Sequence, residues 1–234
     1  MRHVRGVLFD KDGTLIDFEG SWLAFARSMA LMAAEGDAAR AGVLLEQAGY
    51  DPATGRFRAG SVFAAGTNAD VVALWHPRLS GAALAERIAA FNDFGANYGA
   101  KAAVALPGMH DAVGLLHRRG YLLGVATNDS ERGARETLAL LGLSEMFVSA
   151  YGFDSVAQPK PAPDVVRAFA GATGLGLGEI AMVGDNAHDI MAGRAAGCGL
   201  VIGVLSGNGR QEDLAEADEI IDSIADLPAL LGER

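Results

Sequence analysis

The sequence predicts an α/β protein built on a doubly wound parallel sheet. Short apolar runs alternate with amphipathic helical patterns from residue 106 onward, which is typical of parallel strands joined by crossover helices. One further apolar run, Gly6–Asp10, supplies a strand near the N-terminus. Residues 18–98, between these two parts, show helical periodicity without a convincing strand.

We therefore expect a core domain formed by residues 1–17 and 99–234, and an inserted all-α domain over residues 18–98, called the helical insert below. Its first helix should bury one face, because six apolar residues recur at helical spacing: Trp22, Phe25, Ala26, Met29, Ala30 and Ala33. Two more helices are expected over residues 71–75 and 84–91. Breaks between helices are expected at residues 36–37 and 49–52.

The elements of the core domain follow from the same patterns. The glycines at 120 and 142 end two amphipathic stretches, and Pro163 is suited to the first turn of a helix. We expect helices over residues 109–119, 131–141, 163–172 and 188–196. We expect the remaining strands over residues 121–126, 147–151, 180–183, 200–205 and 219–221.

Composition restricts the class of protein and its surroundings. The chain has 234 residues and a formal net charge of −10, which argues against a general nucleic-acid binder. Its single cysteine, Cys198, cannot form an intramolecular disulfide, so we expect a reducing compartment. We read no signal peptide before the first strand and no apolar run of the ~18 residues that a membrane helix needs. The expected location is the cytoplasm.

Two aspartates, Asp10 and Asp12, follow the first predicted strand directly. Open α/β sheets place their ligands at the carboxyl ends of the strands, so both carboxylates should reach a binding site. One carboxylate can attack a substrate while the other moves a proton.

Two further segments carry groups that bind phosphate. Thr127 and Asn128 follow the predicted strand at 121–126, and a hydroxyl beside a free backbone N–H can hold phosphate oxygens. The same residues are also common in turns and helix caps. Lys160 lies among three prolines that restrict the backbone, and it is either a phosphate-binding charge or a solvated residue of a rigid surface loop.

A second acidic pair, Asp185 and Asp189, follows the predicted strand at 180–183. Clustered carboxylates suit Mg²⁺, which prefers oxygen ligands, although either residue could instead cap a helix. The neighbouring His188 is expected on the solvent side of its helix. Taken together, the four segments lie at the same side of a parallel sheet, which predicts one cleft containing a metal, a nucleophile, a proton carrier and a phosphate clamp.

With these four segments, the chain resembles the haloacid dehalogenase-like (HAD) phosphohydrolases, in particular the branch similar to phosphoglycolate phosphatases. Residues 10–14 match the first motif of the family, Thr127-Asn128 the second, Lys160 the third, and Gly184-Asp185 with Asp189 the fourth. The resemblance implies a Rossmann-like core and a small helical cap domain formed by the insert. One departure is Lys11, which lies where Leu, Met or Phe is common in the family.

The resemblance also implies a role for each motif residue. Asp10 would be the nucleophile that forms an aspartyl-phosphate, and Asp12 would protonate the leaving oxygen and then assist water. Mg²⁺ would be held by Asp10, Asp185 and the backbone carbonyl of Asp12, with Asp189 supporting the site. The transferring phosphoryl group would be bound by Thr127, Asn128 and Lys160.

The expected activity is Mg²⁺-dependent hydrolysis of a small phosphorylated metabolite, phosphoglycolate-like or a sugar phosphate, by a monomer or homodimer. A phosphomutase using the same aspartates, a dehalogenase and a non-catalytic phosphate-binding module remain alternatives. Within the insert, Arg56 and Arg58 are candidates to contact the substrate, or belong to an exposed basic loop. The polar run at residues 66–70 is a second candidate.

Overall fold

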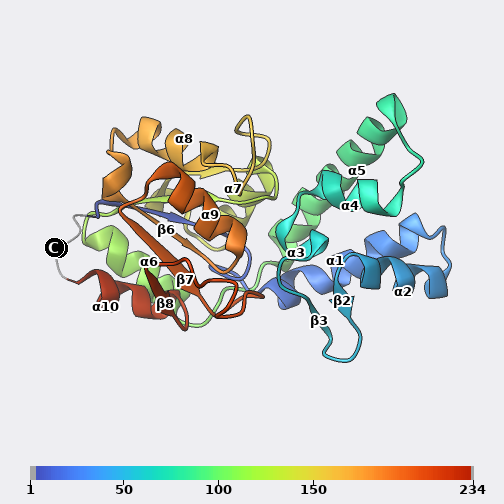
Figure 1. The fold of residues 1–234 in the computed structure, drawn as a ribbon, viewed down its shortest axis with the longest axis horizontal. Helices are drawn as coiled ribbons and strands as arrows, with labels where there is room; N and C mark the ends of the chain where they lie inside the picture. The colour runs from blue at the N-terminus through green and yellow to red at the C-terminus, as the bar shows by residue number, and fades with distance from the viewer. Residues whose placement is uncertain (1–3, 233–234) are drawn as a thin grey trace.

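The computed structural model describes residues 4–232, and its central element is a six-stranded sheet with the strand order β5-β4-β1-β6-β7-β8. Every neighbouring pair in this sheet is parallel. Figure 1 shows the sheet with helices packed around it. The strands are β1 (Gly6–Phe9), β4 (Leu122–Ala126), β5 (Phe147–Tyr151), β6 (Ile180–Gly184), β7 (Leu200–Val204) and β8 (Glu219–Ile221).

The position of β1 in the sheet determines where a ligand would bind. The chain builds β4 and β5 on one side of β1, then returns to build β6, β7 and β8 on the other side. Phe9, the last residue of β1, is paired with Val125 of β4 and with Val183 of β6. The loops that follow these three strands therefore begin side by side at the carboxyl edge of the sheet. The strand order reverses at β1, and open α/β sheets bind their ligands next to such a reversal.

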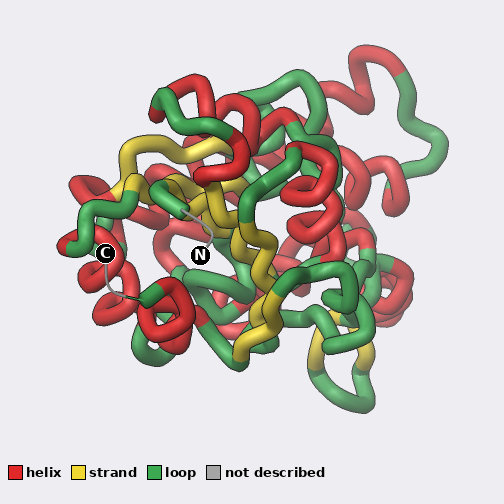
Figure 2. Tube along the Cα trace, turned by 60° about the vertical axis from the view of Figure 1, so that its left-hand side comes forward, coloured by secondary structure: helices red, strands yellow, loops and turns green. Residues whose placement is uncertain are grey.

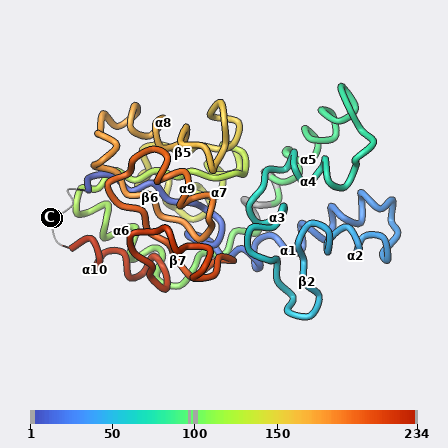
Figure 3. The backbone as a smooth tube through the Cα atoms, viewed as in Figure 1, coloured from blue at the N-terminus to red at the C-terminus, as the bar shows by residue number. Residues whose placement is uncertain are grey.

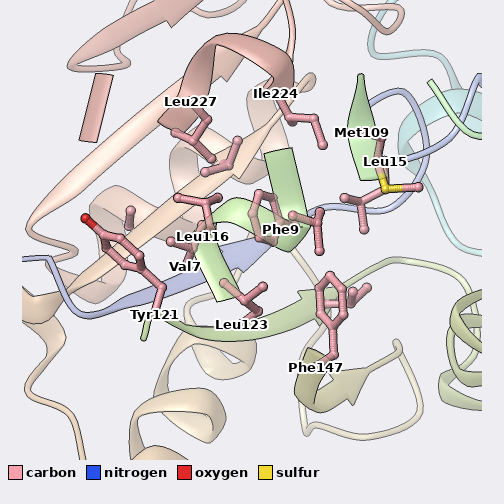
Figure 4. Packing of buried hydrophobic residues seen from close by; sticks show 14 of the residues in the cluster. Val7, Phe9, Leu15, Met109, Leu116, Tyr121, Leu123, Phe147, Ile224 and Leu227 are labelled. Atoms are coloured by element: carbon pink, nitrogen blue, oxygen red, sulfur yellow. The ribbon is translucent and has the colours of Figure 1, made fainter. Parts of the chain in front are cut away.

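Alternating residues of the strands pack on opposite faces of the sheet, as the two-residue period of a strand requires. In β1, Val7 and Phe9 belong to one buried cluster, whereas Leu8 belongs to another. Figure 4 shows the first cluster, in which Phe9 and Val7 lie near Leu116 of α6. This face is covered by α6 (Met109–Arg118), α7 (Glu131–Leu140) and α10 (Leu227–Leu231).

The opposite face of the sheet is covered by α8 (Asp164–Thr173) and α9 (Ala187–Ala196). Phe169 of α8 is fully buried against Leu8 and Met182 in this second cluster. Figure 2 shows the band of strands with helices around it. Short 3₁₀ turns at 144–146, 177–179 and 224–226 complete the part of the chain around the sheet.

The helical insert contains α1 (Phe18–Ala33), α2 (Ala38–Gln47), α3 (Val62–Ala65), α4 (Asn68–Trp75) and most of α5 (Gly81–Ala102). The predicted buried face of α1 is confirmed, since all six of its residues are buried. The expectation of an insert without strands is wrong in one place. Tyr50–Asp51 (β2) pairs antiparallel with Arg56–Phe57 (β3), because the glycine- and proline-containing segment between α2 and α3 folds back as a hairpin.

Two neighbouring connections join the insert to the sheet. The outgoing segment and the returning segment meet in an antiparallel bridge between Ile16 and Ala105. The amide of Asp17 donates to Val104, and the amide of Leu106 donates to Leu15. Figure 3 shows the chain passing between the two parts in blue and returning in green.

The parallel α/β architecture predicted from the sequence is confirmed, with most core elements within two residues of their expected bounds. Helix α5 continues to Ala102, past the expected boundary at residue 98, so the division into two domains at that position stays a prediction. None of the helices described between residues 4 and 232 has the length and apolar character needed to cross a membrane.

Candidate active site

Asp10 stands at the centre of the candidate site, directly after β1. Its backbone N–H donates to Val183 of the neighbouring strand, which extends the sheet by one residue. The carboxylate is buried and accepts a hydrogen bond of 2.6 Å from the Nζ atom of Lys160. Burial raises the pKa of Asp10 to about 7, because the nearby charges of Asp189 and Asp12 add to the effect and Lys160 offsets only part of it.

Lys160 joins two of the predicted acidic residues. Its ammonium lies 2.6 Å from Asp10 and 2.5 Å from Asp189, and the side chain is buried. Burial by itself would lower the pKa of Lys160, but the charges of Asp10 and Asp189 outweigh it and raise the pKa above its usual value. The alternative of a solvated lysine on a surface loop is therefore excluded.

Asp10, Asp185 and Asp189 form a cluster in which one carboxylate oxygen of each lies within 4.8 Å of the others. Asp185 follows β6 and accepts a hydrogen bond of 2.8 Å from the backbone N–H of Asn208. Asp189 is in the first turn of α9 and accepts from the N–H of Asn186, so it also caps this helix. The capping alternative for Asp189 is thus correct, but the second oxygen of this carboxylate remains turned towards Lys160.

The charges of this cluster fit a divalent cation. Three carboxylates are buried here, and Lys160 contacts only those of Asp10 and Asp189. Burial, together with the charges of Asp10 and Asp189, raises the pKa of Asp185 well above its usual value. The backbone also closes tightly around Asp185, since a Cβ atom at Gly207 would lie 2.0 Å from its Oδ2 atom. Carboxylate oxygens held in this way are the ligands that Mg²⁺ prefers.

Asp12 does not belong to the carboxylate cluster and has different partners. Lys11 donates to it at 2.9 Å, and the indole N–H of Trp22 in α1 also donates to it. The Lys11 ammonium is buried, lies 3.4 Å from Asp129 and stands 4.8 Å from the centre of the Trp22 ring. Burial favours a lower pKa for Lys11, but Asp12 and Asp129 outweigh it, so the pKa is raised and the residue keeps its charge.

The predicted phosphate-binding residues Thr127 and Asn128 follow β4 beside this group. The Thr127 hydroxyl is buried and accepts from the N–H of Asp129. The Asn128 side chain donates to the carbonyls of Ala65, at 2.9 Å, and Lys160, at 3.0 Å. Within residues 4–232, no acceptor is recorded for the backbone N–H of Asn128, which is the group expected to meet a phosphoryl oxygen.

A pocket of about 650 Å³, its open mouth included, brings these residues together. The seven motif residues predicted from the sequence all line it: Asp10, Asp12, Thr127, Asn128, Lys160, Asp185 and Asp189. Its opposite wall comes from the insert and includes Phe18, Trp22, Phe25, Phe63, Ala64, Thr67, Asn68 and Val71. The polar run at residues 66–70 therefore contributes to the pocket.

Sequence reasoning did not assign several residues of the pocket to a site. Trp22, which the sequence pattern places on a buried helix face, and Asp129, which follows the Thr127-Asn128 motif, both line the pocket. His188 was expected to face solvent, but it is half-buried in the pocket wall, with Nδ1 3.1 Å from the carbonyl of Ala65. The sequence does offer a signal for Trp22: a buried indole N–H usually needs a hydrogen-bond acceptor, so a tryptophan on an apolar helix face indicates a polar partner nearby.

The structure does not bring Arg56 and Arg58 into the pocket lining. Arg56, in β3, is exposed and contacts Glu19 at 3.3 Å and the carbonyl of Gly207 at 3.3 Å. Arg58 donates to the carbonyl of Glu46. Contact of either residue with a substrate stays a prediction.

The arrangement provides the groups for nucleophilic displacement with proton transfer. A buried carboxylate, Asp10, faces a lysine and an acidic cluster, and a second carboxylate, Asp12, lies two residues away in the same pocket. Such a set can attack an electrophilic centre, neutralise the charge around it and move a proton to a leaving group.

Comparison with known proteins agrees with this geometry. A phosphoglycolate phosphatase of Neisseria meningitidis is 37% identical over 126 residues, a match that spans 52% of this chain and 53% of that protein. The phosphoglycolate phosphatase of Salmonella typhimurium is 31% identical over 99% of this chain and 94% of its own length. Among solved structures, a predicted phosphoglycolate phosphatase of Haemophilus somnus has a TM-score of 0.75 at 22% identity, covering 99% of this chain and 100% of its own.

The model of the haloacid dehalogenase-like hydrolases matches residues 4–197, a range that includes the helical insert and all four motifs. Together with the relative that is similar over nearly its full length, this match establishes that the chain belongs to the haloacid dehalogenase-like hydrolase family.

Proposed function

We propose that this chain is a Mg²⁺-dependent phosphatase that hydrolyses a small phosphorylated metabolite through an aspartyl-phosphate intermediate. The observation that carries the proposal is the contact between Lys160 and Asp10 inside a buried acidic cluster, in a pocket that also contains Asp12. Phosphoryl transfer depends mainly on positioning and on neutralisation of charge, and this cluster provides both.

In the first step, an Asp10 oxygen attacks phosphorus while the bond from phosphorus to the ester oxygen breaks. Asp12 gives its proton to the departing oxygen, so the products are an alcohol and the phosphorylated Asp10. In the second step, Asp12 takes a proton from water as this water attacks phosphorus. The bond from phosphorus to Asp10 breaks, and phosphate and the free carboxylate are released.

The remaining residues of the site bind and orient the phosphoryl group. Lys160 places a positive charge next to the carboxylate of Asp10. Thr127 and the backbone N–H of Asn128 would donate to the other phosphoryl oxygens. Mg²⁺ would be held by Asp10, Asp185 and the Asp12 carbonyl, supported by Asp189, and when bound it neutralises the charge of the phosphoryl oxygens.

The helical insert has a clear role in this proposal. We propose that residues 18–98 form a cap domain over a core domain of residues 1–17 and 99–234. The insert supplies one wall of the pocket, and a wall of this kind excludes water from the reaction and selects the substrate. The relatives described above are phosphoglycolate phosphatases, which supports a small phosphate monoester as the substrate.

The experiment that tests the proposal is phosphate release from a panel of phosphorylated metabolites, measured with Mg²⁺ and with EDTA. We expect Mg²⁺-dependent release from one or a few compounds. Full activity in EDTA would contradict the metal site and point to dehalogenase-like chemistry. An isomerised product with little free phosphate would identify a phosphomutase, and folded protein that binds phosphate without turnover would identify a binding module.

A further inference from the structure

The part of the pocket wall that comes from α1 and α3 is aromatic. Trp22 and Phe25 of α1 pack edge to face with ring centres 5.2 Å apart, and Phe63 of α3 lies 6.3 Å from Phe25. Phe18 packs against Phe63 at 6.3 Å, so the rings form one continuous group. All four residues line the pocket and give its insert side an apolar surface. The polar Thr67 and Asn68 line it as well, but their side chains already donate to Asp70 and Asn92.

The charges of the pocket are distributed unevenly. Among the described lining residues there is one lysine, Lys160, and no arginine, and the Lys160 ammonium already contacts Asp10 and Asp189. His188 also lines the pocket, with Nδ1 held 3.1 Å from the carbonyl of Ala65. The part of the wall that comes from the insert contains no charged side chain. The two carboxylates next to this wall, Asp12 and Asp129, both contact Lys11, whose side chain is itself buried behind the lining.

This distribution of charge favours some alcohols over others. A carboxylate or second phosphate on the alcohol would lose its hydration against aromatic rings without gaining a lysine or arginine partner, which is unfavourable. An amine would find its acidic partners already held by Lys11. An uncharged group with an apolar body loses no ionic hydration and gains from leaving water.

We propose that the substrate is a phosphate monoester of an uncharged, largely apolar alcohol, aryl or alkyl, and that it is neither a carboxylate-bearing ester such as phosphoglycolate nor a bisphosphate. This inference rests on the proposed phosphatase function and specifies its substrate class. The alcohol packs against Phe18, Trp22, Phe25 and Phe63, and the phosphoryl group occupies the side of Lys160.

The first test compares three esters of similar size that differ in charge: propyl phosphate, 2-phosphoglycolate and O-phosphoethanolamine, with benzyl phosphate as a larger apolar ester. We expect kcat/KM for propyl and benzyl phosphate to exceed that for the two charged esters by at least about tenfold. A preference for 2-phosphoglycolate or for O-phosphoethanolamine would overturn the inference and leave the phosphatase function intact. Release of phosphate from none of these esters or of a broad metabolite panel would instead overturn the phosphatase function.

The second test adds a cation to the aromatic wall. Ala64 lines the pocket from the short helix α3 and is half-buried, so a long side chain there can reach the pocket. We expect Ala64→Arg to raise the ratio of kcat/KM for 2-phosphoglycolate over propyl phosphate by about tenfold. The matched variant Ala64→Met, of similar reach without charge, should leave this ratio near that of the wild type. An unchanged ratio in a folded Ala64→Arg protein would contradict the inference.

The third test examines the arginine outside the pocket. If Arg56 reached the substrate, Arg56→Ala would reduce kcat/KM for 2-phosphoglycolate more than for propyl phosphate. We expect the same ratio in this variant as in the wild type, because Arg56 contacts Glu19 and Gly207 instead. A selective loss of at least tenfold for the charged ester would overturn the inference. The comparison of esters with the wild-type protein needs no variant and so decides the question even if a variant fails to fold.

Discussion

The indole N–H of Trp22 donates a hydrogen bond to Asp12. The two residues belong to different parts of the molecule, since Trp22 lies in the first helix of the insert and Asp12 in the loop that follows β1. The Lys11 ammonium contacts both, at 2.8 Å from an Asp12 oxygen and 4.8 Å from the centre of the Trp22 ring. The proposed proton carrier is therefore oriented from both sides of the pocket.

The first prediction concerns this orientation. We expect Lys11→Met to lower kcat for an alkyl phosphate by about 10–100-fold with little change in KM, since a hydrogen bond to a charged group is worth roughly 1.5–3 kcal/mol. In this variant the Asp12 carboxylate has no ammonium group beside it, so it is no longer held in the orientation that proton transfer requires. Lys11→Arg should restore part of the activity, because it keeps the positive charge.

The matched comparison uses a second substrate with the same variant. p-Nitrophenyl phosphate has a leaving group that needs no proton, so Lys11→Met should reduce its turnover much less than that of an alkyl phosphate. Trp22→Phe should show the same pattern with a smaller effect, because it removes one neutral donor. Equal losses for both substrates would mean that Lys11 supports only the fold.

The second prediction concerns the nucleophile. Asp10→Asn should reduce turnover by about a thousandfold or more, because the amide cannot form the covalent intermediate. The matched control is Asp111→Asn, the same change at an exposed position in the first turn of α6. Both proteins should be checked for folding by circular dichroism. Asp10→Asn activity within about tenfold of the wild type would contradict the assignment.

The third prediction concerns pH and metal. The folded protein holds a proton on Asp10 with a pKa of about 7, against 3.8 in the unfolded chain, so this group stabilises the fold below pH 4. That contribution is lost as the pH rises through 7. We therefore expect Tm in EDTA to fall between pH 5 and pH 8. Mg²⁺ should reduce this fall, because it favours the charged carboxylate and binds only the folded state.

The control for this prediction is again Asp10→Asn, which removes the titrating carboxyl group. Its Tm in EDTA should depend less on pH between 5 and 8 than that of the wild type. A wild-type Tm in EDTA that stays constant or rises over this range would contradict the raised pKa of Asp10.

The fourth prediction concerns the single cysteine. Burial raises the pKa of the Cys198 thiol to about 12, and the charge of Arg194 offsets only part of this effect. Because the thiolate is the reactive form, Cys198 should react with a disulfide reagent at pH 8 at least about tenfold more slowly in the folded protein than in urea. Equal rates would show that the thiol is not protected.

The sequence by itself predicted the strands that carry the four motifs, because these strands are buried on both faces and read as continuous apolar runs. It also predicted that Asp10, Thr127, Lys160 and Asp185 would converge. For Asp10, Thr127 and Asp185 the expectation rests on the rule that parallel strands present their carboxyl ends at one edge of the sheet, and Lys160 lies in the loop between β5 and α8. These residues all line one pocket.

Only the tertiary structure decided which side chains of the site contact one another. A local pattern cannot show that Lys160 is bound to Asp10 across 150 positions of the chain. Nor can it show that the apolar face of α1 includes a tryptophan whose N–H reaches Asp12, or that Lys11 is buried rather than solvated. These contacts join residues from separate elements, and their geometry depends on how the insert packs against the sheet, which local propensity does not encode.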